Sequence, residues 1–78
     1  MENSDKSLEN KLSQIASRLK ELRKQKYKSH ETFAFEHEIN RVQYWRVEKG
    51  ENITLKTLLK ILEIHKISLK DFFSEIQG

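Results

Sequence analysis

Residues 41–49 bring together the side-chain types that proteins use to read the edges of DNA bases. At about 100° per residue, a helix over this range turns one mixed face outward. That face, with its flank and first turn, holds cations, an aromatic ring, a small apolar group and an amide: Arg41, Val42, Gln43, Trp45, Arg46 and Lys49. Arginine pairs with guanine, glutamine pairs with adenine, and a small apolar side chain contacts the methyl group of thymine. Placing Val42 beside Trp45 on a polar face needs an explanation, and base recognition supplies one.

The opposite side of the same helix is suited to a protein core, because it presents Tyr44, Val47 and Glu48. Asn40 is a favourable N-cap for this helix, and Gly50 is favourable just past its C-terminus. The sequence therefore predicts a short helix, 41–49, that is anchored on one side and free to meet DNA on the other.

A second short helix is predicted immediately before it. Ser29 is a good N-cap, and residues 30–37 offer Phe33 and Ala34 to a core. Two short helices separated by about three residues are typical of a helix-turn-helix.

Apolar residues at helical spacing predict three further helices and hence an all-α bundle of five. The first runs from near residue 7 to about residue 26 along the stripe Leu8, Leu12, Ile15, Leu19 and Leu22. Thr54 caps the fourth helix, whose expected core residues are Leu55, Leu58, Leu59 and Leu62. Ser68 caps the fifth, which presents Leu69, Phe72, Phe73 and Ile76.

The chain is expected to divide into an N-terminal extension, residues 1–10, and a helix-turn-helix domain, residues 11–78. We expect the extension to be partly helical or disordered. Core packing is expected from Ile15 onward, whereas Leu8 and Leu12 either fray with the first turns or contact a second chain.

Positive charge is concentrated before the helix-turn-helix. The 78 residues include 15 Lys+Arg and 12 Asp+Glu, a formal net charge of +3, and residues 18–28 hold six basic residues around Glu21. This block is either a solvated helix face or a flank that faces phosphate, and both readings remain open.

The composition also limits the function. The chain has no cysteine, which excludes disulfides and zinc–thiolate sites. We expect a cytoplasmic protein, because there is no signal peptide and no apolar run near the roughly 20 residues that cross a bilayer. His30, His37 and His65 form no known ligand set with the nearby acids, so no metal or cofactor is expected. No catalytic arrangement is visible, so we do not expect an enzyme.

Residues 15–73 resemble the XRE family, the lambda-repressor-like helix-turn-helix domains of phage repressors and many bacterial regulators. The family pattern is a basic first helix, two short helices around a turn with an Ile-Glu-x-Gly-like ending, and two more helices. The positions in register are Ser29, Phe33, Ala34, Ile39, Asn40, Tyr44, Val47, Glu48 and Gly50. The segment TLKTLLKILEIHKISLKDFF is similar to the family's last two helices.

The resemblance implies a sequence-specific regulator of transcription, expected to be a repressor, that binds double-stranded DNA in the major groove. Arg41, Val42 and Arg46 match its base-reading positions, and Gln43 neighbours them. The expected DNA-backbone contacts are His30, Asn40, Trp45, Lys49, Asn52, Thr54 and Lys56. Arg23 matches a first-helix arginine that pairs with the motif glutamate, here Glu48. A homodimer on a near-palindromic operator, associated with the nucleoid when bound, is also expected.

Several residues depart from the family pattern. Glu38 and Lys66 stand where a turn glycine is frequent, and His37 and His65 stand at usually apolar positions. Trp45 replaces a usually small residue.

Two other functions remain open: an antitoxin-like or other protein-binding module with secondary DNA binding, and a helical scaffold that binds no DNA.

Overall fold

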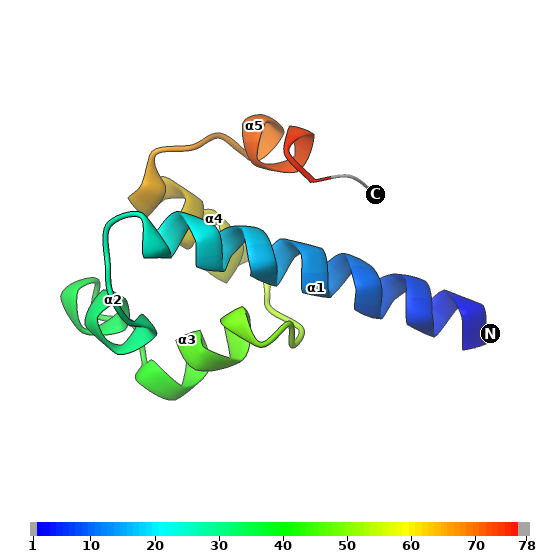
Figure 1. Ribbon diagram of the computed structural model, residues 1–78, viewed down its shortest axis with the longest axis horizontal. Coiled ribbons are helices and arrows are strands. Elements are labelled where there is room, and N and C mark those ends of the chain that lie inside the picture. Colours follow the sequence, from blue (N-terminus) through cyan, green and yellow to red (C-terminus); the bar gives the residue numbers. More distant parts are fainter. Residues whose placement is uncertain (1, 77–78) are drawn as a thin grey trace.

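The computed structural model describes residues 2–76, and this part of the chain folds into five helices without a strand. The helices are α1 (Glu2–Lys24), α2 (His30–Glu36), α3 (Arg41–Glu48), α4 (Leu55–His65) and α5 (Leu69–Ser74). In Figure 1, α2 and α3 lie on one side of α1, and α5 lies on the other. The predicted all-α, five-helix fold with a helix-turn-helix is confirmed.

Short polar side chains begin the last four helices, as the sequence predicts. Each cap oxygen accepts a hydrogen bond from the backbone N–H three residues ahead, which would otherwise lack an intrahelical partner. The four caps and their distances are Ser29 at 3.1 Å, Asn40 at 2.9 Å, Thr54 at 3.1 Å and Ser68 at 3.0 Å.

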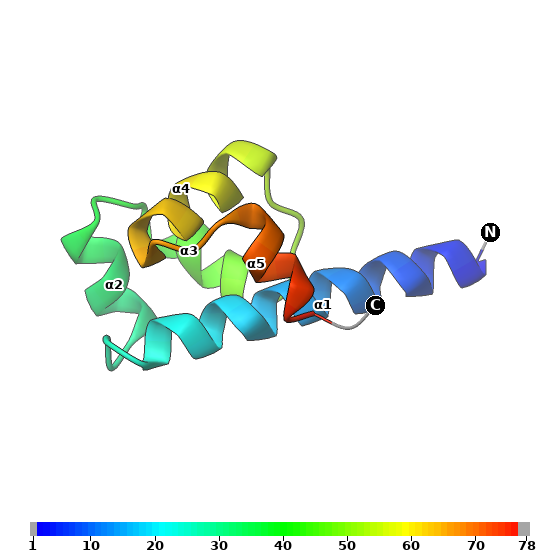
Figure 2. The same ribbon diagram turned by 90° about the horizontal axis from the view of Figure 1, so that it is seen from above.

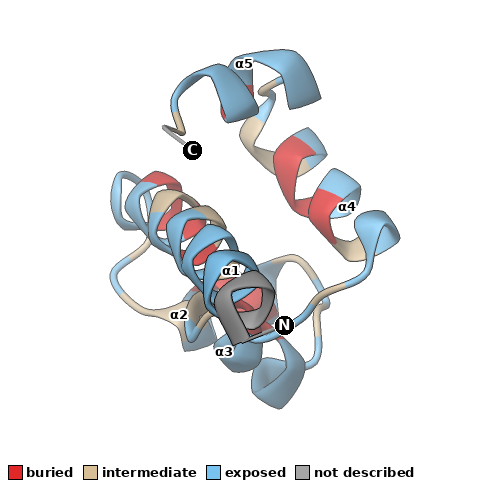
Figure 3. Ribbon diagram, turned by 90° about the vertical axis from the view of Figure 1, so that its right-hand side faces the viewer, coloured by how far each residue is buried: buried red, intermediate tan, exposed pale blue. Residues whose placement is uncertain are grey.

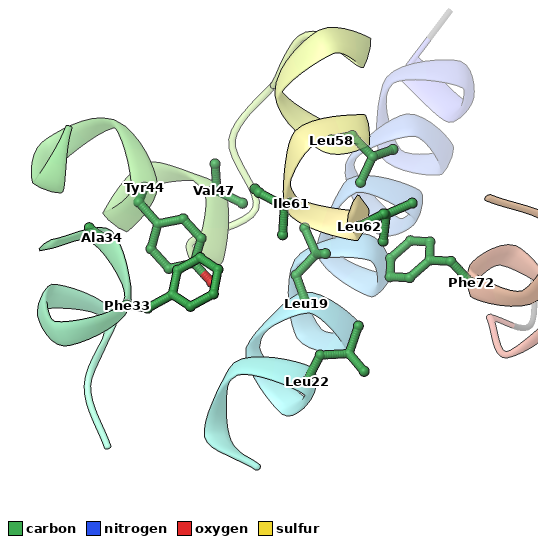
Figure 4. Close-up of a cluster of buried hydrophobic side chains, with 10 residues drawn as sticks. All are labelled: Leu19, Leu22, Phe33, Ala34, Tyr44, Val47, Leu58, Ile61, Leu62 and Phe72. Carbon is green, nitrogen blue, oxygen red and sulfur yellow. The ribbon is translucent and has the colours of Figure 1, made fainter. Parts of the chain in front are cut away.

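All five helices contribute to one apolar core (Figure 4). Its ten buried residues are Leu19, Leu22, Phe33, Ala34, Tyr44, Val47, Leu58, Ile61, Leu62 and Phe72. The rings of Phe33 and Tyr44 lie 4.8 Å apart between centroids, so α2 and α3 are packed together through aromatic contact. This contact holds the two halves of the helix-turn-helix as a unit.

The predicted core face of α4 is wrong in part. Leu58 and Leu62 are buried, but Leu55 and Leu59 are exposed, and the fully buried neighbour is Ile61. Figure 3 shows buried and exposed stretches side by side on this helix. Apolar residues occupy more than half of its circumference, so periodicity alone does not choose which of them face the other helices.

The first helix also differs from its expected limits. It begins at Glu2 rather than near residue 7, and it ends at Lys24, two residues before the expected end. No glycine or proline interrupts this stretch, so nothing in the sequence stops the helix earlier. Its N-terminal part extends beyond the other helices (Figures 1 and 2), and Leu8 is exposed there. The division at residue 10 remains a prediction.

Two turns place ordinary residues in the left-handed region. Glu38 has φ 56° after α2, and Lys66 has φ 58° after α4. These are the two positions at which the sequence departs from a turn glycine. Both turns form nevertheless, at a cost of about 1 kcal/mol or more for each residue with a Cβ.

His37 and His65, which precede these turns, contact aromatic residues at the edge of the core. Nε2 of His37 lies 2.8 Å from the hydroxyl of Tyr27, and the ring of His65 stacks on Phe33 at 5.3 Å. Burial lowers the pKa of His65, and the positive charge of Lys26 acts in the same direction. These histidines pack against aromatic side chains and link the ends of α1, α2 and α4.

No helix in residues 2–76 combines the length and apolar character needed to cross a membrane.

Candidate nucleic-acid interface

The third helix presents one face to the core and the other to solvent. Tyr44 and Val47 are buried, whereas Val42 is 50% exposed and Trp45 is 42% exposed. Arg41 and Arg46 are also exposed on this helix. An apolar pair thus stands between two arginines on the open face of a helix that is anchored in the core.

Trp45 is held by its neighbour one turn later. The ammonium of Lys49 lies 4.3 Å from the centroid of the indole ring, within the range of a cation–π interaction. This contact limits the freedom of the ring while leaving much of it accessible. It also keeps a positive charge at the exposed end of α3.

A shallow hollow lies between α3 and the start of α2. It has a volume of about 370 Å³ and is lined by His30, Glu31, Arg41, Val42 and Trp45. Four of these five residues are ones that the sequence analysis assigned to DNA contact. The fold therefore brings His30, from another helix, beside the apolar pair of α3.

A second hollow lies between α3 and the loop that leads to α4. It has a volume of about 200 Å³ and is lined by Gln43, Arg46, Val47, Glu51, Asn52, Ile53, Thr54 and Thr57. Four expected contact residues meet here: Gln43, Arg46, Asn52 and Thr54. The exposed residue Lys56 lines neither hollow and lies in the first turn of α4.

Two of the expected backbone-contact residues already act as helix N-caps. Oδ1 of Asn40 accepts the N–H of Gln43, and Oγ1 of Thr54 accepts the N–H of Thr57. The amide nitrogen of Asn40 has no such role in its cap and is the group that this side chain can offer to a phosphate.

Two acidic residues of these hollows were missed by the sequence analysis. Glu31 lies 3.9 Å from Arg41, and Glu51 lies 3.9 Å from Arg46. Glu51 follows Gly50, which lies just past the end of α3, and Glu31 belongs to α2, so no helical periodicity relates the two acids to the arginines. The one local signal in the sequence was Glu31 itself, an acidic residue in the first turn after the cap Ser29.

The orientation of α3 depends on a buried ion pair. Nε and Nη2 of Arg23 each donate to a carboxylate oxygen of Glu48 at 2.9 Å, and the two side chains are 5% and 7% exposed. Burial is the largest single effect on the pKa of Glu48 and raises it, but the hydrogen bonds and positive charge of Arg23, with smaller effects of Tyr44 and His30, together outweigh burial and lower that pKa. Burial raises the pKa of the neighbouring Tyr44 hydroxyl. This corner of the site therefore holds one cation, one anion and one neutral phenol.

The basic block 18–28 is partly neutralised within the protein. Arg18 lies 3.3 Å from Glu21 and 3.6 Å from Glu75, and Arg23 is engaged by Glu48. The other basic residues of the block are exposed lysines: Lys20, Lys24, Lys26 and Lys28. These lysines are the basic groups of residues 18–28 that remain accessible to an anion.

Comparison with known proteins gives one match. The sequence model of the helix-turn-helix family matches residues 19–72, which is more than half of the chain. No curated protein and no solved structure matches the chain. The matched segment contains α2, α3 and α4 together with both hollows. The chain therefore belongs to the XRE-type helix-turn-helix family of DNA-binding regulators.

Proposed function

We propose that this chain binds a specific double-stranded DNA sequence and represses transcription by inserting α3 into the major groove. The observation that supports the proposal most directly is the two-sided character of α3, with Tyr44 and Val47 buried and Val42 and Trp45 exposed. A helix fixed on one side by a core can be laid into a groove without rearrangement. The major groove of B-DNA is wide enough to admit an α-helix.

The open face of α3 has a group for each kind of base-edge contact. Arg41 and Arg46 would each pair with the two acceptors of a guanine, and Gln43 would pair with adenine. Val42 would contact the methyl group of a thymine, and Trp45 would lie against a sugar of the backbone.

Phosphate contacts would come from both sides of this helix. His30 stands in the hollow beside α2, and Asn52 stands in the hollow before α4. Lys49, Lys56 and the amide of Asn40 are the other candidates. Such contacts fix the position of the protein on the duplex but do not read its sequence.

A homodimer is part of the proposal, because one small module gives little specificity on its own. An apolar groove lies between α1 and α5, lined by Lys11, Gln14, Ile15, Phe73 and Ile76. Beyond it, the stripe of α1 continues through Leu12 to the exposed Leu8. A second copy that laid its own α1 along this groove would cover the stripe of both chains.

Selection of bound fragments from a random DNA pool tests the proposal most directly. We expect an enriched near-palindromic sequence with half-sites about one helical turn apart. With about five phosphates neutralised, log K should fall with log salt at a slope near −4.5. Failure to enrich any sequence, or a flat salt profile, would contradict DNA reading.

One observation favours an antitoxin-like protein-binding function instead. Phe35 on α2 is 85% exposed, which is unusual for a large aromatic side chain. A partner that covers Phe35 would be retained by the wild-type chain and lost from Phe35→Ser. A reporter gene placed behind the selected operator would measure repression in cells.

A further inference from the structure

Each of the two arginines assigned to base reading has an acidic neighbour outside α3. Nη1 of Arg41 lies 3.9 Å from Oε2 of Glu31, and Nε of Arg46 lies 3.9 Å from Oε1 of Glu51. All four side chains are more than half exposed. Both distances exceed the length of a hydrogen bond, so the arginines are drawn toward the acids without being locked to them.

The acids lie on the side of the molecule that would meet DNA. Glu31 shares its hollow with Arg41, Val42 and Trp45. Glu51 shares the other hollow with Gln43 and Arg46. Exposed ion pairs contribute little to folding, so stability does not account for acidic residues at both of these places.

Carboxylates here affect the two kinds of DNA contact unequally. A guanidinium has five N–H groups in a planar fork, so an acid near one edge leaves another edge for the two acceptors of a guanine. A phosphate carries a full negative charge, and an arginine that binds it would bring that charge toward the nearby carboxylate. Binding to arbitrary DNA depends on phosphate contacts, whereas base contacts specify the sequence.

We infer that Glu31 and Glu51 are specificity-determining residues that weaken binding to arbitrary DNA more than binding to the operator. They withhold Arg41 and Arg46 from phosphates and leave one edge of each guanidinium available to a base. This inference rests on the proposed function.

The test uses the charge-neutral variants Glu31→Gln and Glu51→Gln, which keep the size of the side chain. Glu63→Gln is the matched control, because Glu63 is exposed on α4 and lines neither hollow. Dissociation constants are measured at one salt concentration for the operator selected by the wild-type chain. A scrambled duplex of the same length and base composition is measured in parallel.

We expect each hollow variant to bind the scrambled duplex about twofold to fivefold more tightly, in line with the strength of an exposed ion pair. Affinity for the operator should change less. The dissociation constant for the scrambled duplex divided by that for the operator should therefore fall. The salt slope on scrambled DNA should steepen by about 0.9 for each arginine that gains a phosphate. Glu63→Gln should leave the ratio unchanged.

Two results would overturn the inference and leave the proposed function standing. The first is an unchanged or increased ratio in both hollow variants. The second is an equal fall of the ratio in Glu63→Gln, which would make net charge the cause. If the wild-type chain selects no operator, the proposed function fails and the inference fails with it. The wild-type measurement therefore distinguishes the two failures.

Discussion

Arg23 and Glu48 connect the first helix to the helix that would read DNA, through two hydrogen bonds of 2.9 Å. The remaining nitrogen of the same guanidinium donates to the backbone carbonyls of Tyr27 and Lys28, at 3.2 and 3.0 Å. The side chain of Arg23 thus connects α1 to the turn that follows it and to α3. Because Glu48 belongs to α3, the pair helps to set the direction in which the open face of that helix points.

Loss of this anchor should be costly. Arg23→Met leaves Glu48 as a buried carboxylate without its partner, which typically lowers the free energy of unfolding by about 3–5 kcal/mol. Urea denaturation measures the change. The control is Arg18→Met, because the pairs of Arg18 with Glu21 and Glu75 are more exposed and should contribute about 1 kcal/mol or less. Equal losses in the two variants would contradict a special role for Arg23.

Stability should fall in mild acid because of His65. Its Nε2 is buried and lacks a hydrogen-bond partner among the described residues. Its pKa is lowered from 6.5 by burial first, and then by the charges of Lys26 and His37. The unfolded chain therefore takes up a proton at a higher pH than the folded chain does. This contribution to stability is complete above pH 6.5 and is lost as the pH falls through the folded pKa.

Urea denaturation between about pH 7.5 and pH 5.5 shows this effect as a falling free energy of unfolding. His65→Phe should flatten the profile, since phenylalanine can keep the stacking contact with Phe33 and does not titrate. His30→Gln, at the surface hollow, should retain the slope. A profile that is equally steep in His65→Phe and the wild-type chain would rule out His65 as its source.

The arginines of α3 should affect discrimination rather than folding. Arg41→Ala and Arg46→Ala should each lose about 1–3 kcal/mol of preference for the operator over a site changed at the matching base. Lys24→Ala should weaken binding to all sequences alike, because an exposed lysine of α1 can reach only the backbone. Gel-shift titrations on paired duplexes measure both effects. An unchanged preference in Arg46→Ala would show that the reading face is placed incorrectly.

Val42 should contact the methyl group of a thymine in the operator. Replacing the contacted thymine with deoxyuridine removes that methyl group and leaves base pairing intact. Burial of such a group contributes about 0.8 kcal/mol, or roughly a fourfold change in affinity. The loss should occur with the wild-type chain and nearly disappear with Val42→Ala. Similar losses in both proteins would assign the methyl contact to another residue.

Phe73 should control the association of two chains. Phe73→Lys places a charge in the apolar groove between α1 and α5 and should shift sedimentation toward the monomer. Leu59→Lys is the matched control, because Leu59 is exposed on α4 outside that groove. A monomeric wild-type chain, or a dimer that survives Phe73→Lys, would exclude this surface as the interface.

Much of the architecture is determined locally. Ser29, Asn40, Thr54 and Ser68 cap helices whose first amides lie within three residues, so their effect is visible in the sequence. The two faces of α3 follow from helical geometry in the same way. The match of residues 19–72 to the helix-turn-helix family agrees with this local pattern.

Other features depend on which surfaces meet. The sequence of α4 offers leucines over a wide arc, and only packing against the other helices buries Ile61 while leaving Leu55 and Leu59 exposed. Glu31 and Glu51 come from segments on either side of α3, and folding alone brings them within 4 Å of Arg41 and Arg46. Helix periodicity and capping act over a few residues, so the sequence by itself determined five helices and the two-sided character of α3. Contacts between distant segments decided the buried side of α4 and the charges that surround the open face of α3.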